Sequence, residues 1–286
     1  MAGIQRISSK RKPTKTKTKR TGTESLKLTG RYIEKELEEG LRETAINNRP
    51  GYFRCSGIGQ GARSLLFSYL GVGEQTFELK NIRYMDNGTK GHERWEDWLT
   101  KSGLALELED TVQHPDLPVI GRFDFIVKHP DFERLLLELK TTGSRKSKNL
   151  VMPDDEHLSQ WMVYAHLKEI KYGFVIYEER DSLRPKYFPL MRDGYDLYIY
   201  TTRGVHIETR KNFLGDIYDK VKFVMWCADN NAFPKEECEP CNKWGCNYPD
   251  LCEQWEKDKE IVEFKTWQQE KFEEQELIPS NMEKIK

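Results

Sequence analysis

The sequence predicts an α/β domain in which a small mixed sheet is flanked by helices, with a cysteine-rich segment toward the C-terminus. Two observations carry this prediction. The middle of the chain reads as a helix, three strand-like runs, a further helix and a further strand. The length of 286 residues is also enough to bury a sizeable core.

Residues 1–23 are expected to form a disordered basic tail. Its first 20 residues hold eight Lys or Arg and no acid, and they have almost no apolar side chains to offset the entropy of ordering. The tail is interpreted either as a solubilising arm or as a contact for a polyanion, and in a eukaryote also as a nuclear address. The whole chain has a net charge of −1, which argues against a wholly basic nucleic-acid binder.

The first two helices are predicted from composition and from end signals. Residues 24–46 have helix-forming composition with a polar face. Residues 55–72 follow, with Ser56 as the expected N-cap and an expected end near Gly71. The basic N-terminal tail lacks the apolar core of a secretory signal, and no run of about 18 apolar residues occurs in the chain. We therefore expect a cytoplasmic protein, or a nuclear one in a eukaryote, without membrane association.

A third helix and the core strands follow. Residues 87–103 place Trp95, Trp98 and Leu99 on one apolar stripe, and Gly103 is the expected stop. The strand-like runs cover residues 104–112, 119–128 and 132–142, with a turn expected at 128–131.

In the second half of the domain, helices and strands again alternate along the chain. Residues 153–170 read as a helix that begins with Pro153 and three acids, and residues 172–179 read as a buried strand. A strand-and-helix passage leads to the cysteine-rich segment. We expect one domain over 24–252, which includes the cysteine-rich segment, and a separate charged helix in 253–286.

Three charges interrupt the apolar runs of the predicted hairpin: Asp124, Glu138 and Lys140. Residues i and i+2 of a strand share a face, so Glu138 and Lys140 project together, and a hairpin brings Asp124 to Glu138 at its open end. Two adjacent carboxylates need a cation, and Mg²⁺ or Mn²⁺ prefers such oxygen ligands. A lysine nearby can orient a water or a phosphate. The alternative is a plain ion pair of Lys140 at a sheet edge.

Four motifs occur in a defined order along the chain. They are His92 within "NGTKGHERWE", G-x-x-D at Gly121–Asp124, E-x-K at Glu138–Lys140, and Q-x-x-x-Y formed by Gln160 and Tyr164. In this order they resemble the PD-(D/E)XK nuclease superfamily. The likeness is to its RecB-like exonuclease branch, which includes CRISPR-associated exonucleases with an iron–sulfur cluster. The resemblance covers roughly residues 55–252.

The resemblance implies a restriction-endonuclease-like core and a metal-dependent DNA exonuclease that acts in recombination, repair or the replication of a mobile element. It implies that the Mg²⁺ or Mn²⁺ ligands are His92, Asp124, Glu138 and the carbonyl of Leu139. It implies catalytic roles for Asp124, Glu138, Lys140, Gln160 and Tyr164. The expected partner is DNA with single-stranded character, and a recombination or replication protein is a further expected partner. A structure-specific endonuclease and a non-catalytic binder with a zinc knuckle remain alternatives.

A basic segment directly follows the E-x-K strand. Residues 143–149 contain Arg145, Lys146 and Lys148, which are expected to hold phosphates or else to form a solvated loop.

The cysteines indicate a metal centre. Four of the six fall within residues 238–252, and no signal peptide suggests an oxidising compartment. The resemblance implies a [4Fe–4S] cluster held by Cys55, Cys241, Cys246 and Cys252, although Gly61 stands where the family has its first cysteine. The alternative is a zinc site formed by Cys238, Cys241, Cys246 and Cys252. Cys227 is interpreted as a buried core residue.

Overall fold

The computed structural model describes residues 32–33, 35–36, 50–72, 79–201, 207–235 and 248–269. The chain divides into two compact units, Met1–Thr44 and Ala45–Lys286. In the first unit only four helical residues are described, at positions 32–33 and 35–36. The predicted tail over 1–23 and the cysteines at 238, 241 and 246 lie outside the described residues.

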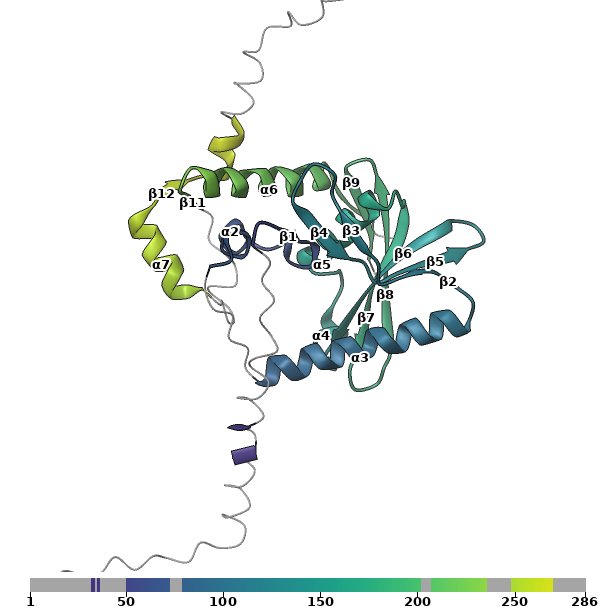
Figure 1. Cartoon of the computed structure of the whole chain (residues 1–286). Coiled ribbons are helices and arrows are strands. Elements are labelled where there is room, and N and C mark those ends of the chain that lie inside the picture. The colour runs from purple at the N-terminus through teal and green to yellow at the C-terminus, as the bar shows by residue number, and fades with distance from the viewer. Residues whose placement is uncertain are drawn as a thin grey trace, which may run out of the picture. The chain divides into compact units, whose positions relative to one another are not determined.

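The described elements of the second unit are drawn in Figure 1. The helices are η1 (Cys55–Gly57), α2 (Ala62–Leu70), α3 (Leu79–Lys101), α4 (Ser144–Asn149), α5 (Asp155–Leu167), α6 (Phe213–Asp229) and α7 (Pro249–Asp258). The strands are β1 (Phe53–Arg54), β2 (Ala105–Leu108), β3 (Thr111–Gln113), β4 (Val119–Arg122), β5 (Phe125–His129), β6 (Glu133–Thr142), β7 (Tyr172–Glu179), β8 (Pro185–Asp193), β9 (Asp196–Tyr200), β10 (Ile207–Arg210), β11 (Ala232–Pro234) and β12 (Glu260–Val262).

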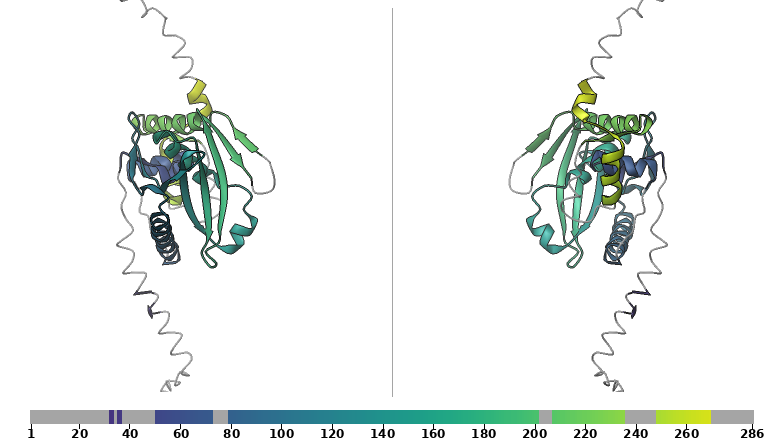
Figure 2. Two further views of the ribbon diagram at one scale, coloured as in Figure 1. Left: turned by 90° about the vertical axis from the view of Figure 1, so that its right-hand side faces the viewer. Right: turned by 90° about the vertical axis from the view of Figure 1, so that its left-hand side faces the viewer.

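A seven-stranded mixed sheet organises the second unit, in the order β10-β9-β8-β7-β6-β5-β2. Among its described pairings, β6 and β7 run parallel and the others run antiparallel. The parallel pair requires a crossover, which α4 and α5 supply. The strands fan out because the sheet twists (Figure 2). The α/β class is confirmed: α3 is followed by the five strands β2 to β6, then by α4 and α5, and then by β7.

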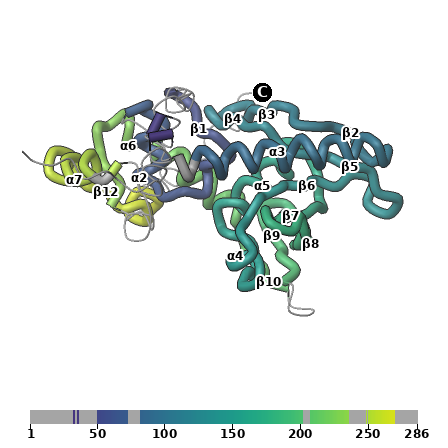
Figure 3. The backbone as a smooth tube through the Cα atoms, turned by 90° about the horizontal axis from the view of Figure 1, so that it is seen from below, coloured from purple at the N-terminus to yellow at the C-terminus, as the bar shows by residue number. Residues whose placement is uncertain are grey.

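The two faces of the sheet carry separate apolar clusters. Leu137 and Leu139 of β6 pack on one face with Trp95 of α3. Leu136 packs on the opposite face with Trp161 of α5. Figure 3 shows α3 running past β6 and β5 toward β2. The predicted alternation along β6 is therefore confirmed, and it leaves Glu138 and Lys140 on the α5 face.

Two predicted strands are broken where the structure bends. The runs over 104–112 and 119–128 were each expected to be continuous, but β3 and β4 belong to a small sheet with β1, whereas β2 and β5 belong to the large sheet. The first break falls at Glu109, whose φ is 43°, and the second includes Asp124. The amide of Glu109 donates to the Asp124 carbonyl at 2.8 Å, so the two breaks coincide. Exchange of strand partners between two sheets is the physical reason for both.

The helix ends differ from the prediction in two places. The expected helix over 55–72 is divided into η1 and α2. The N-cap of α2 is Gly61 rather than Ser56. The helix is interrupted between them because Gly59 packs against the α5 backbone. A Cβ at Gly59 would lie 2.4 Å from the Glu156 Cα. The predicted end at Gly71 is confirmed, with φ of 66°.

The third helix is longer than predicted, because α3 begins at Leu79. Gly103 follows its end with φ of 67°, as predicted. Trp95 and Leu99 are buried, but Trp98 is 47% exposed and is not part of the core. Trp98 instead lies under the guanidinium of Arg94.

The C-terminal region is not one uninterrupted helix. After α7, β12 pairs in parallel with β11, and residues 264–269 are helical again. Trp267 packs against Phe223 of α6, which ties this region to the core. Within the described residues, no helix is both long and apolar enough to cross a membrane.

Candidate active site

The hairpin of β5 and β6 brings Asp124 and Glu138 together. Phe125 faces Leu137 in the antiparallel register, so the next residue pair outward is Asp124 and Glu138. The Leu139 amide donates to Asp124 Oδ2 at 2.6 Å, which fixes the aspartate across the hairpin. Both carboxylates are buried.

Burial controls the protonation of this pair. It raises the pKa of Asp124 to about 7, against the opposing effect of Lys140. Burial also raises the pKa of Glu138 to about 7, and the nearby Asp124 charge adds to the rise. Two carboxylates kept out of water therefore hold protons near neutral pH unless a cation replaces them.

Lys140 connects this pair to α5. Its Nζ donates to Glu138 Oε1 at 2.7 Å and to Gln160 Oε1 at 2.8 Å. Burial alone would lower the lysine pKa, but Glu138 and Asp124 outweigh it and the pKa of Lys140 is raised. The ammonium is thus charged and held at a fixed position.

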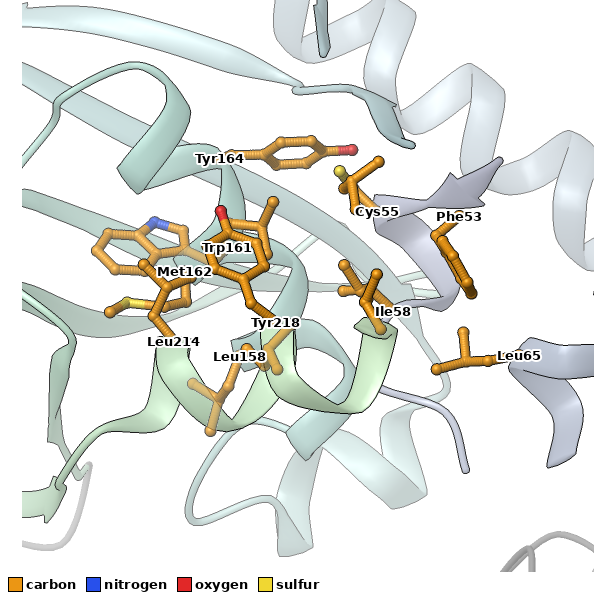
Figure 4. Close-up of a cluster of buried hydrophobic side chains, with 14 of the residues drawn as sticks. Phe53, Cys55, Ile58, Leu65, Leu158, Trp161, Met162, Tyr164, Leu214 and Tyr218 are labelled. Atoms are coloured by element: carbon orange, nitrogen blue, oxygen red, sulfur yellow. The ribbon is translucent and has the colours of Figure 1, made fainter. Parts of the chain in front are cut away.

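Tyr164 lies one helical turn beyond Gln160. The Gln160 amide donates to the Tyr164 hydroxyl at 3.4 Å, and that hydroxyl donates to the Arg122 carbonyl at 2.9 Å. Figure 4 shows the Tyr164 hydroxyl pointing toward Cys55. Only glycine fits at position 121, because a Cβ there would lie 2.6 Å from both the Tyr164 hydroxyl and the Cys55 Cβ.

α3 delivers His92 to the same site. His92 Nδ1 lies 3.3 Å from Asp124 Oδ1. Burial lowers the pKa of His92, so the imidazole is neutral at neutral pH. Gly91 lets the helix approach β6, since a Cβ there would lie 3.0 Å from the Thr141 Cγ2.

Buried Glu178 of β7 anchors this part of α3. Glu178 forms an ion pair with Arg94 and accepts a hydrogen bond from Trp95 Nε1 at 2.7 Å. These contacts hold Arg94 and Trp95, which follow His92 within one turn of α3, against β7.

Sequence reasoning missed Glu109, which lies at the break between β2 and β3. Its Oε1 is 3.5 Å from His92 Nδ1, and its Oε2 is 3.2 Å from Arg122 Nη2. The sequence contains no signal for it beyond an acid near the end of a strand-like run. Only the bend of the strand brings it to His92.

His157 was also missed, although it lies in the first turns of α5. Its Nδ1 is 2.6 Å from the Tyr177 hydroxyl. Burial, followed by the Lys140 charge, lowers its pKa to about 3, so this imidazole is neutral.

The residues present fit a hard divalent cation. Glu138 Oε2 is buried and has no hydrogen-bond partner among the described residues, which is costly for a carboxylate without a cation. His92 and the Leu139 amide contact Asp124, the neighbour of Glu138 across the hairpin, so two carboxylates, a neutral imidazole and backbone groups occur together. Carboxylates, imidazoles and carbonyls are ligand types that Mg²⁺ and Mn²⁺ accept. In the described parts of the chain, no three or more His, Cys, Asp or Glu side chains are placed so that they could hold a metal ion together. Lys140 acts instead as the counter-ion of Glu138.

The cysteines within the described residues have separate surroundings. Burial, followed by the Glu138 charge, raises the pKa of Cys55 to about 12. The Cys252 sulfur accepts a hydrogen bond from Arg63 Nη1 at 3.3 Å. Cys227 is buried in the core as predicted. Because Cys238, Cys241 and Cys246 lie outside the described residues, the [4Fe–4S] and zinc assignments stay predictions.

The chain is similar to several solved structures. The protein SSO0001 matches with a TM-score of 0.47 and 16% identity, over 79% of this chain and 96% of that chain. The alkaline exonuclease LHK-Exo from Laribacter hongkongensis matches with a TM-score of 0.44 and 13% identity, over 64% of this chain and 90% of that chain. A phage-related exonuclease from Haemophilus somnus 129PT matches with a TM-score of 0.32 and 14% identity, over 62% of this chain and 91% of that chain. No protein-family model matches the sequence, and neither does any curated protein.

Proposed function

We propose that this chain is a metal-dependent DNA nuclease of the RecB-like branch of the PD-(D/E)XK superfamily, and that it acts as an exonuclease. The observation that carries the proposal is the buried cluster of Asp124, Glu138 and Lys140, in which one Glu138 oxygen lacks a partner among the described residues. A purely structural ion pair would have no use for the second carboxylate and the neutral histidine beside it.

In this proposal Asp124, Glu138 and the Leu139 carbonyl bind Mg²⁺ or Mn²⁺, with His92 as a neutral ligand. When bound, the ion polarises a phosphoryl oxygen and lowers the pKa of a water. The Lys140 ammonium orients that water or a phosphate oxygen. Gln160 holds Lys140 by the 2.8 Å hydrogen bond, so the lysine approaches the phosphate from a fixed direction.

Tyr164 acts on the site through Gln160 and the Arg122 carbonyl. Tyr164 positions the C-terminal end of β4, where Arg122 lies. It does not serve as an acid, because burial raises its pKa above the usual range of tyrosine. We also propose that a [4Fe–4S] cluster, or alternatively zinc, closes the cysteine-rich segment. DNA with single-stranded character is the proposed substrate, in recombination, repair or replication of a mobile element.

The test compares an end-labelled linear single strand with a closed single-stranded circle of the same sequence. Protein purified without oxygen is mixed with Mn²⁺ or Mg²⁺ and each substrate, beside an EDTA control. We expect metal-dependent degradation of the linear strand and survival of the circle. Cutting of the circle would move the assignment to an endonuclease on the same site. DNA binding without cleavage of either substrate would favour a non-catalytic binder.

A further inference from the structure

A cleft of about 620 Å³ opens next to Lys140, where β6 ends and α4 begins. It is lined by three residues at and after the end of β6, by three residues of α4 and by one residue of the turn after β7: Thr141, Thr142, Gly143, Arg145, Lys146, Asn149 and Arg180. Its volume is in the range of ordinary ligand sites. Because a strand advances about 3.3 Å per residue, the backbone of residues 141–143 lies within about 10 Å of the Lys140 backbone.

The charge of this cleft has one sign. Of its seven lining residues, Arg145, Lys146 and Arg180 are cations and none is a carboxylate. Lys146 is paired with Asp154. Within the described parts of the chain, Arg145 and Arg180 form no ion pair with any carboxylate. Two guanidinium groups without an ion-pair partner favour an anion at the cleft, and the carboxylate next to Arg180 in the sequence, Asp181, accepts a hydrogen bond from Ser144 instead.

Arg180 is held in position by two contacts and by the space that Gly143 leaves for it. Its amide donates to the Thr142 carbonyl at 2.9 Å, and its guanidinium carbon lies 4.4 Å from the centre of the Tyr84 ring. Gly143 leaves room for it, since a Cβ there would lie 3.3 Å from Arg180 Nη2. The guanidinium is therefore oriented before any ligand arrives, which lowers the entropy lost on binding.

We infer that this cleft binds the phosphates of the DNA strand adjoining the phosphate that is cut at Lys140. The inference rests on the proposed function and assigns the direction in which the strand leaves the site, over α4 and toward the β7–β8 turn. Guanidinium groups suit this ligand because their planar fork matches phosphate oxygens in a bidentate way. No carboxylate lines the cleft to repel a polyanion.

The test measures binding of a short fluorescein-labelled single strand by anisotropy, in EDTA so that cleavage does not contribute. Wild type, Arg145→Ala and Arg180→Ala are compared across ~50–200 mM salt, where log K falls linearly with log[salt] with a slope of about −0.7 per phosphate contact on a single strand. We expect each variant to bind more weakly than wild type and to lose roughly 0.7 from the slope. Lys128→Ala is the matched control, because it removes one exposed charge at the far end of β5 and should leave the slope unchanged.

Arg180→Lys separates charge from geometry. It should keep the salt slope of wild type but bind more weakly, since lysine lacks the bidentate fork. If thermal melting shows that Arg180→Ala is unfolded, the binding of Arg180→Lys and of Arg145→Ala decides whether the cleft contacts phosphates. The inference would be overturned if Arg145→Ala and every folded Arg180 variant bound DNA with the affinity and the salt slope of wild type. Cleavage by the wild-type protein would still leave the proposed function intact in that case, whereas a wild type that neither binds nor cleaves DNA would remove both.

Discussion

At the scale of single residues, the three charges in the hairpin have different counterparts. Asp124 is held by the Leu139 amide, Lys140 is held by Glu138 and Gln160, and one oxygen of Glu138 has no partner among the described residues. Buried charges persist when each is paired, so the unpaired oxygen is the position where the folded protein most needs a cation.

This arrangement predicts a stability that depends on both pH and metal. Free Asp and Glu titrate near pH 4, whereas in the fold the pKa values of Asp124 and Glu138 are raised to about 7. The folded state therefore binds more protons between these limits, and metal-free stability falls as the pH rises from about 4 to about 7. A divalent cation replaces those protons. We expect Mn²⁺ to raise the Tm more at pH 8 than at pH 6, as measured by calorimetry.

The matched variants for this experiment are Asp124→Asn and Glu138→Gln, which keep the shape of the side chain and remove the charge. Each should reduce the Mn²⁺-induced shift in Tm at pH 8. An equal shift at both pH values, or a full shift in both variants, would show that the ion binds elsewhere.

The same scale explains Gly121, which sequence reasoning placed in the motif without a physical role. Gly121→Ala would push a methyl group into the Tyr164 hydroxyl and Cys55, so we expect a loss of about 1–3 kcal/mol of unfolding free energy. Gly57→Ala is the control, because its Cβ would meet Gln60 at an ordinary contact distance of 3.7 Å. Urea denaturation compares the two, and equal stabilities would contradict the packing argument.

At the scale of elements, the hairpin was the most predictable part of the site. The turn at 128–131 and the alternation of leucines determine its register, and the i, i+4 spacing of Gln160 and Tyr164 follows from the helical repeat. The bends in the two preceding strands could not be predicted, because neither run contains a glycine or proline at its break. Exchange of partners between two sheets is a tertiary effect, and Glu109 enters the site only through it.

The approach of α3 to β6 gives a test at this scale. Gly91→Ala would set a methyl group 3.0 Å from the Thr141 Cγ2 and move the helix that carries His92. We expect a lower cleavage rate at saturating metal and DNA. Gly88→Ala is a close control on the same helix, since its Cβ would be 3.9 Å from Thr141 Oγ1, and it should keep the rate while stabilising the helix by up to ~1 kcal/mol. Equal rates in the two variants would contradict the role of this contact.

At the scale of the whole molecule, a buried arginine connects elements far apart in the sequence. Arg63 of α2 donates to the Pro234 carbonyl at 2.7 Å and pairs with Glu256 of α7. Its contact with the Cys252 sulfur places one end of the cysteine-rich segment at this junction. A metal held by that segment would reinforce a closure that protein contacts already begin.

The metal content of the cysteine-rich segment distinguishes the two predicted centres. We expect protein purified without oxygen to contain iron and sulfide, and we expect Cys55→Ser and Cys246→Ser to lose both. Zinc that persists in Cys55→Ser but not in Cys246→Ser would assign the local four-cysteine site instead. Cys227→Ser is the control, because that cysteine is a buried core residue. Elemental analysis that finds neither metal would contradict both assignments.

The most direct test of the central claim is the rate of DNA cleavage as a function of added Mn²⁺ for wild type, Glu138→Gln and Lys140→Met. Lys168→Met serves as the control, since Lys168 pairs with Glu107 away from Gln160 and Glu138. We expect cleavage by wild type and by the control to rise with Mn²⁺, and both site variants to lose at least ~100-fold in rate. Folded Glu138→Gln and Lys140→Met proteins that cleave at the wild-type rate would contradict the assignment of the buried hairpin charges as a catalytic site.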